Sequence, residues 1–169
     1  METQQVTGLA ESLEGLGVTT ERATPSTLSA ALADAVEPPA VGVPLPFAPD
    51  ALEDADVALE SSPSELEAAA TGVTPARFAI AETGTLAIPS TPAGEEPVSL
   101  YPPRHVAVVA ERDVYPDVAG AFERLATEFE EGTDSVVFAT GVSATADMGE
   151  LVEGVHGPRE VHVIVVTDT

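Results

Sequence analysis

Residues 135–166 read SVVFATGVSATADMGELVEGVHGPREVHVIVV, and this stretch decides the fold class. Residues 135–139 form an apolar run typical of a buried strand, and residues 161–166 form a second run with apolar side chains on both faces. Strands that are apolar on both faces suit a sheet that helices cover on each side. The stretch therefore predicts an α/β protein built on an open sheet with helices on both faces.

The segment between these two strands carries the first candidate site. Residues 140–147 read TGVSATAD and precede a constrained corner, GVHGP, at residues 154–158. The hydroxyls and the glycine predict a turn that leads into the start of a helix at the carboxyl edge of a sheet. Ligands of open α/β sheets sit at that edge, and helix N-termini attract anions. The alternative is that Ser143 or Thr145 only caps the helix.

The remaining periodicity fits one domain without a linker or a repeat. A Ser-Pro-Ser-Glu pattern at residues 62–65 predicts a capping box. In the helix expected at residues 117–131, the spacing places Val118, Phe122 and Phe129 inward, together with Ala121 and Leu125. Residues 91–97 read as a polar loop. The other predicted helices cover residues 3–16, 24–36 and 63–71, and the other strands cover residues 18–22, 40–43, 57–59, 78–81, 86–89 and 105–110.

The charge of the chain is strongly one-sided. Among 169 residues, Asp and Glu number 29 against six Arg and no Lys, for a formal net charge of −23. Dispersed acidic residues repel one another at low ionic strength and are screened in concentrated salt. We interpret this composition as an adaptation to a salt-rich cytoplasm. We expect neither nucleic acid nor an anionic membrane as a partner.

Several chemistries are excluded by residues that the chain lacks. Without cysteine it cannot form a disulfide, a thiolate nucleophile or its own iron–sulfur cluster. It contains neither a Gly-x-Gly-x-x-Gly fingerprint nor a phosphate-binding loop with lysine. The histidines and carboxylates lack close ligand spacing, so no metal site is predicted. A start that reads METQQ and the absence of a long apolar run lead us to expect a soluble cytoplasmic protein.

The candidate catalytic residues are Glu82, His105, Asp147 and His156, and each has a structural alternative. Glu82 is either a ligand-binding carboxylate or a solvent-facing turn residue. His105 and His156 are suited to proton transfer near neutral pH, and a buried structural histidine is the alternative. Asp147 is favourable at a helix N-terminus whether or not a ligand binds there.

A second set of residues is expected to bind a ligand without reacting with it. Arg104 can hold a carboxylate bidentately, although it can equally pair with a surface acid. Gly84 allows a close approach of the backbone or only a positive φ. The full set of predicted ligand-binding residues is Thr83, Gly84, Thr85, Arg104, Gly141, Ser143, Thr145 and Gly157.

Three segments resemble the LUD domain of the lactate-utilization protein C (LutC) family. They read AIAETGTL at residues 79–86, SLYPPRHVAVV at residues 99–109, and GVSATAD at residues 141–147 continued by GVHGPREVHV at residues 154–163. The match is strong over residues 72–166 and weak over residues 1–71. The resemblance implies a single LUD domain of a haloarchaeal type, similar in fold to the sugar-phosphate isomerase and CoA-transferase-like superfamily.

The same resemblance implies a function in the oxidation of L-lactate to pyruvate. The chain would be a non-cluster subunit that binds a small carboxylate or an iron–sulfur partner, with the iron–sulfur clusters only in partner subunits. Alternatively, it would be a stand-alone enzyme or a ligand-sensing module that acts on a sugar phosphate or a CoA-type anion. Homo-oligomer formation stays open, as does the question of whether the chain is itself catalytic.

Overall fold

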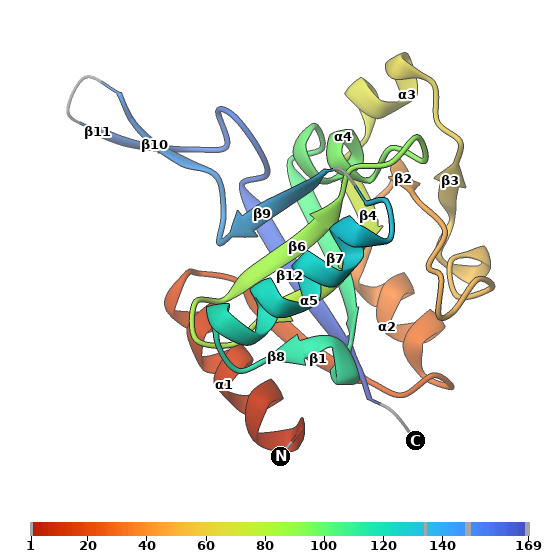
Figure 1. Cartoon of the computed structure of the whole chain (residues 1–169). Helices are drawn as coiled ribbons and strands as arrows, with labels where there is room; N and C mark the ends of the chain where they lie inside the picture. Colours follow the sequence, from red (N-terminus) through yellow and green to blue (C-terminus); the bar gives the residue numbers. More distant parts are fainter. Residues whose placement is uncertain (1, 134, 148–149, 168–169) are drawn as a thin grey trace.

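A six-stranded parallel sheet forms the centre of the protein in a computed structural model that describes residues 2–133, 135–147 and 150–167 (Figure 1). Its strand order is β1-β12-β7-β4-β2-β3, and every neighbouring pair is parallel. The α/β class expected from the sequence is confirmed. The strands are β1 (Thr19–Ala23), β2 (Ala40–Gly42), β3 (Val57–Leu59), β4 (Thr71–Pro75), β7 (Arg104–Ala110) and β12 (Glu160–Val166).

A second sheet lies beside the first and has the order β8-β5-β6-β9. Two further strands pair only with each other and form an arm that projects away from both sheets (Figure 1). The second sheet consists of β5 (Phe78–Ile80), β6 (Thr85–Pro89), β8 (Val114–Tyr115) and β9 (Val136–Thr140), and the arm consists of β10 (Ala144–Asp147) and β11 (Glu150–Glu153).

The two faces of the central sheet are covered differently. One face packs against α2, whereas the other packs against α1 and the second sheet, whose outer face carries α5 (Figure 1). A sheet therefore replaces part of the helical cover that the apolar strands predict. The helices are α1 (Glu2–Gly15), α2 (Leu28–Ala35), α3 (Pro63–Ala68), α4 (Glu95–Leu100), α5 (Val118–Glu130) and two short 3-10 helices, η1 (Glu53–Ala55) and η2 (Glu111–Asp113).

Local signals in the sequence fix several elements correctly. The side chain of Ser62 accepts a hydrogen bond from the backbone N–H of Glu65, while the Glu65 carboxylate accepts from the Ser62 N–H, which completes the predicted capping box of α3. The Ser62 hydroxyl and then the Ser62 N–H lower the pKa of Glu65, because both donate hydrogen bonds to its carboxylate. The predicted start of α2 is early, because residues 24–27 form a turn and the helix begins at Leu28.

No helix follows Gly141 within residues 142–147, where the sequence predicts one to start. Residues 144–147 instead form β10, which pairs antiparallel with β11. The strand before the turn also differs from its prediction, since β9 is an edge strand of the second sheet and alternates between half-buried and exposed residues. An apolar run next to a glycine turn does not distinguish a buried strand from an edge strand, because both carry the same residues.

The sequence prediction missed the central strand β4 and the helix α4. The helix predicted over residues 63–71 ends at Ala68 in the structure, and β4 occupies residues 71–75. The helix α4 begins inside the predicted polar loop. A Cβ atom on Gly72 would lie 2.0 Å from the carbonyl oxygen of Val98, so glycine permits the contact between β4 and α4. Gly72 and Pro75 make this strand read as a turn, although its five residues are buried.

The amphipathic face of α5 is narrower than its spacing predicts. Ala121 and Leu125 are buried against the second sheet, but Phe122 and Phe129 are about half exposed and Val118 is also exposed. Their predicted inward placement is wrong, because the buried face of this helix follows Ala121, Leu125 and Glu128 instead. Among the described residues, none of the helices has the length and apolarity needed to cross a membrane.

Candidate functional site

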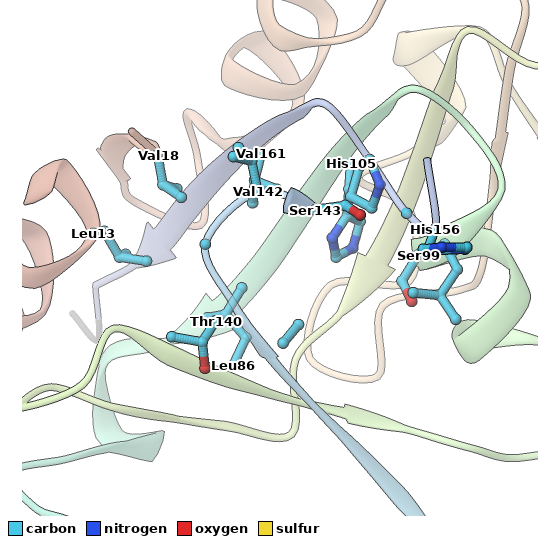
Figure 2. Close-up of a pocket in the computed structure, with 15 residues that line it drawn as sticks. Leu13, Val18, Leu86, Ser99, His105, Thr140, Val142, Ser143, His156 and Val161 are labelled. Atoms are coloured by element: carbon cyan, nitrogen blue, oxygen red, sulfur yellow. The ribbon is translucent and has the colours of Figure 1, made fainter. Parts of the chain in front are cut away.

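A cavity of about 180 Å³ lies between α1, α4, the end of β9 and the start of β12 (Figure 2). Figure 2 shows Ser99, His105, Ser143 and His156 grouped at one end of this cavity, with Leu13 and Val18 at the other. We call it the amino-end cavity. Its other lining residues are Leu86, Leu100, Ala139, Thr140, Gly141, Val142, Gly157, Pro158 and Val161.

The cavity lies at the amino ends of the parallel strands rather than at their carboxyl ends. His105 is the second residue of β7, and Val161 is the second residue of β12. Only β9, in the second sheet, contributes its carboxyl end, through Thr140. The predicted combination of a carboxyl edge with a helix N-terminus is therefore wrong for the main sheet, since the turn at Gly141 leads into β10.

His105 is the most buried polar group of the cavity, with 2% of its surface exposed. Its Nε2 lies 2.8 Å from the hydroxyl Oγ1 of Thr74 on the neighbouring strand β4. Burial lowers the pKa of His105 to about 4, because the apolar surroundings disfavour the charged imidazolium. At neutral pH the cavity therefore contains a neutral imidazole, which can donate one hydrogen bond and accept another.

The Gly-Val-His-Gly-Pro corner is fastened to the Ser143 turn by backbone hydrogen bonds. Ser143 N–H donates to the carbonyl of Pro158, and Gly154 N–H donates to the carbonyl of Ser143, both at 2.8 Å. A Cβ atom on Gly157 would lie 3.1 Å from Cβ of Ser143, so the two segments touch. This packing brings the exposed His156 to the rim of the cavity.

Hydroxyl groups connect the Glu-Thr-Gly-Thr turn to the cavity. The Thr85 hydroxyl lies 2.8 Å from that of Thr83 and 2.7 Å from that of Thr140. Of these three threonines, Thr140 lines the cavity. Gly84 has a positive φ of 64° and fits against the last turn of α1, where an added Cβ would lie 2.9 Å from Leu16. Thr83 and Thr85 thus reach the cavity through Thr140.

Glu82 does not line the cavity. Its Oε1 accepts a hydrogen bond of 3.0 Å from the backbone N–H of Val118, the first residue of α5. The side chain lies in a separate hollow beside α1, together with Gln4 and Pro116. This contact gives Glu82 a structural role at a helix N-terminus, where negative charge is favourable.

Arg104 lies on the opposite face of the sheet from His105, because consecutive residues of a strand point to opposite faces. Its guanidinium donates to Glu160 at 2.7 Å and to the carbonyl of Ala35 at 2.9 Å. Thr145 lies in the arm and is paired with Val152. The backbone of Asp147 belongs to β10, but its side chain lies outside the described residues, so its predicted role stays a prediction.

Among the predicted site residues, His105, Gly141, Ser143, His156 and Gly157 meet at one cavity. The sequence analysis missed the contributions of Thr74, Ser99 and Thr140. Thr74 belongs to the unpredicted β4, and Ser99 belongs to the unpredicted α4. The lining contains neither Arg nor Lys among the described residues, and those residues show no group of three or more potential metal-binding side chains.

These features agree with a known protein family. The LUD domain model matches residues 31–166, and the chain therefore belongs to the LUD domain family. Within it, the chain resembles lactate utilization protein C from Deinococcus radiodurans, with 37% identity over 131 residues, 74% of this chain and 59% of that protein. It also resembles lactate utilization protein C from a Geobacillus strain, with 34% identity over 60% of this chain and 44% of that protein.

The chain thus spans only about half the length of the curated relatives it matches. A solved structure of similar size supports the fold over the whole described chain. It is the crystal structure of a DUF162 family protein from Deinococcus radiodurans, with a TM-score of 0.77 and 26% identity, and the match covers 98% of each chain.

Proposed function

We propose that this protein is a component of a lactate-utilization system and that its amino-end cavity binds a small carboxylate, L-lactate or pyruvate. Membership of the LUD family and the likeness to proteins named lactate utilization protein C support the first part. The second part rests on one observation: the neutral imidazole of His105 closes an otherwise mostly apolar cavity beside Ser143 and Ser99.

The size of the cavity suits such a ligand. A protein cavity of about 150 Å³ can hold benzene, and lactate has as many non-hydrogen atoms as benzene. The apolar side chains of Leu13, Val18 and Val161 would contact the methyl group. The hydroxyl of Ser143 and the imidazoles of His105 and His156 would contact the carboxylate and the 2-hydroxyl or 2-oxo group. The Ser99 hydroxyl already donates to the carbonyl of Glu96, so it would accept a hydrogen bond from the 2-hydroxyl of lactate.

The absence of an arginine from the described lining limits the affinity that we expect. A hydrogen bond from a neutral donor to the ligand carboxylate is a bond to a charged group and contributes about 1.5–3 kcal/mol, but the cost of ordering the ligand offsets part of that gain. Three such donors without a guanidinium therefore support binding in the range of about 1 mM to 10 μM. Affinity in this range is that of a metabolite sensor or of a subunit that takes up substrate at cellular concentrations.

Titration calorimetry with L-lactate, pyruvate and acetate tests the ligand. Replacing Ser143 by Ala removes a hydroxyl from the cavity and should weaken lactate binding by about tenfold or more, since a hydrogen bond to the carboxylate is lost. The matched control is Ser135→Ala, since Ser135 is exposed in front of β9 and does not line the cavity. Equal losses in the two variants, or no heat with lactate and pyruvate, would contradict the proposal.

We propose further that an iron–sulfur subunit is the protein partner, because the described chain offers no cysteine ligands and lactate oxidation requires an electron acceptor. Purification of the tagged chain from its native cells at high salt tests this. A cysteine-rich iron–sulfur protein in fixed ratio supports a subunit role. A chain that purifies alone and converts lactate or another substrate by itself would favour the stand-alone enzyme instead.

A further inference from the structure

A second cavity, of about 440 Å³, lies at the other end of the parallel strands. It opens beside the residues that follow β2, β4 and β7, which include Phe47, Arg77 and Arg112. We call it the carboxyl-end cavity. The remaining lining residues come from β4 and its end (Pro75, Ala76), from the loop after β2 (Pro46), from the end of β6 (Pro89), from α4 (Glu95), from η2 (Asp113), and from α5 and its end (Arg124, Glu128, Glu131).

This place is a topological switch point of the sheet. From β2 the chain moves outward to the edge strand β3, whereas β4, β7 and β12 are added on the opposite side of β2. The loops after β2 and β4 therefore leave the sheet in different directions and open a crevice between them. In open α/β sheets, ligands bind in the crevice at the carboxyl ends of the strands where the order reverses.

Arginine is concentrated at this crevice. The chain has only six arginines against 29 acidic residues, and three of the six, Arg77, Arg112 and Arg124, line the carboxyl-end cavity. They come from three different elements of the chain, which only the fold brings together. By contrast, the amino-end cavity has no arginine in its described lining.

A buried carboxylate holds two of these guanidinium groups in place. Glu128 is 2% exposed, and its two oxygens lie 2.7 Å from Nη1 of Arg77 and 2.7 Å from Nε of Arg124. Arg77 Nη1 also donates to the hydroxyl of Thr133 at 2.8 Å. One carboxylate between two guanidiniums leaves these three side chains with one net positive charge, while the described lining as a whole holds four carboxylates against three guanidiniums.

Of the three other carboxylates in the lining, one is engaged away from the arginines, one contacts an arginine of the cavity and one is exposed. Glu95 is buried and accepts hydrogen bonds from the backbone and the hydroxyl of Thr91. Asp113 lies 3.8 Å from the guanidinium of Arg112. Glu131 is exposed at the rim. The Arg124 side chain pairs with Glu128 through its Nε and is 46% exposed, which leaves its terminal nitrogens on the side away from that contact.

We propose that the carboxyl-end cavity binds a small, multiply charged oxyanion, a phosphate or polycarboxylate compound, through Arg124, Arg77 and Arg112. Guanidinium groups bind such oxygens bidentately, and a preordered guanidinium loses less entropy on binding than a free one. Glu128 supplies the preordering. The site is separate from the amino-end cavity and does not depend on the function proposed for that cavity.

Calorimetric titration with inorganic phosphate and with citrate, at constant ionic strength in KCl, tests the site. Arg124→Gln removes the partly exposed guanidinium group but leaves Glu128 paired with Arg77, so we expect the protein to fold. The dissociation constant should rise about tenfold or more, since a charge-assisted contact is lost. The matched control is Arg159→Gln, which removes the same charge from the exposed corner beside the amino-end cavity.

The control variant should change the dissociation constant by no more than about twofold, because exposed charges are screened in salt. If Arg124→Gln unfolds, Arg112→Gln gives the second reading and should also weaken binding. Phosphate binding without citrate binding assigns the ligand to phosphate compounds, and the reverse assigns it to polycarboxylates. No binding of either probe, or equal losses in the cavity and control variants, would overturn the proposal.

Discussion

The two ends of the central sheet carry cavities of opposite chemical character. The amino-end cavity is small, mostly apolar and lined at one end by a neutral imidazole, whereas the carboxyl-end cavity is larger and lined by three arginines and four carboxylates. Strand β7 supplies His105 to the amino-end cavity, where Thr74 of β4 contacts the imidazole, and Arg77 and Arg112 follow the carboxyl ends of β4 and β7 at the other cavity. At the amino end, burial keeps the imidazole of His105 uncharged. At the carboxyl end, the arginine side chains that line the cavity are partly exposed and stay charged.

The largest effect should come from salt, which acts on the whole molecule. A net charge of −23 creates self-repulsion that 1 M KCl screens to a length of about 3 Å. The melting temperature should therefore climb steeply between low salt and molar KCl, by more than any substitution below changes it. Differential scanning calorimetry checks this. An unchanged melting temperature would contradict the interpretation that the chain is adapted to high salt.

Gly72→Ala should disrupt the amino-end cavity by displacing the helix α4, which lines it. An added Cβ would lie 2.0 Å from the Val98 carbonyl, and α4, which supplies Ser99 and Leu100 to the cavity, would have to move. We expect a loss of about 3 kcal/mol in the free energy of unfolding, the upper part of the range for overpacking. Urea unfolding measures it.

Gly8→Ala is the matched control for that substitution. Gly8 lies inside α1, and its added Cβ would make only an ordinary contact at 3.9 Å. Alanine in a helix interior is favoured over glycine by up to about 1 kcal/mol, so the control should be neutral or stabilising. A Gly72→Ala protein as stable as wild type would mean that α4 is not held against β4 as described.

The neutral state of His105 should make stability depend on pH. Its pKa is about 4 in the folded protein against an ordinary value of 6.5. Below pH 6.5 the unfolded chain therefore binds a proton that the folded chain does not. This contribution is complete above about pH 7 and is lost as the pH falls towards 4, by about 3 kcal/mol in total.

Unfolding in urea at pH 7 and pH 4.5 measures this contribution in wild type, His105→Gln and His156→Gln. Carboxylates titrate in all three proteins, so the difference between wild type and His105→Gln isolates the buried imidazole. The exposed His156 serves as the control. Direct NMR titration of the imidazole nitrogens is the sharper measurement, and a His105 that protonates near pH 6.5 would refute the neutral, closed cavity.

The carboxyl-end cavity should be weakened by Glu128→Ala, which leaves two guanidiniums without their carboxylate. Because Arg77 and Arg124 are partly exposed, we expect a loss of about 2 kcal/mol, below the cost of stranding a fully buried charge. Glu123→Ala, on the exposed side of the same helix, should change stability by less than about 0.5 kcal/mol. Equal effects would show that Glu128 does not organise the arginines.

The sequence revealed the amino-end cavity better than the carboxyl-end cavity, for a physical reason. Ser143 and Gly157 lie in turns whose glycines and hydroxyls are visible as local patterns, and His105 follows two prolines at the start of a strand. Thr74 is missing from the prediction because Gly72 and Pro75 are typical of a turn, and β4 is recognisable as a strand only from its pairing with β2 and β7. Arg77, Arg112 and Arg124 have no common spacing and meet only through tertiary packing.

Arg104 illustrates a different failure. The predicted strand begins at His105, so the sequence analysis leaves Arg104 outside it, whereas β7 includes both residues and directs them to opposite faces. A strand that is apolar on both faces also gives no sign of which face carries the site. Only the packing of α1 and the second sheet on the His105 side decides it.

The smallest effect should come from Glu82→Gln, which distinguishes a helix-terminus role from a site role. Its Oε1 accepts the backbone N–H of Val118 at the start of α5, and it lines neither the amino-end nor the carboxyl-end cavity. Loss of the charge should cost about 0.5 kcal/mol, as for an exposed charge at a helix N-terminus. Lactate and phosphate titrations should match those of wild type. A change in lactate affinity above about threefold, with stability unchanged, would return Glu82 to the ligand site and would extend the amino-end cavity to the hollow beside α1.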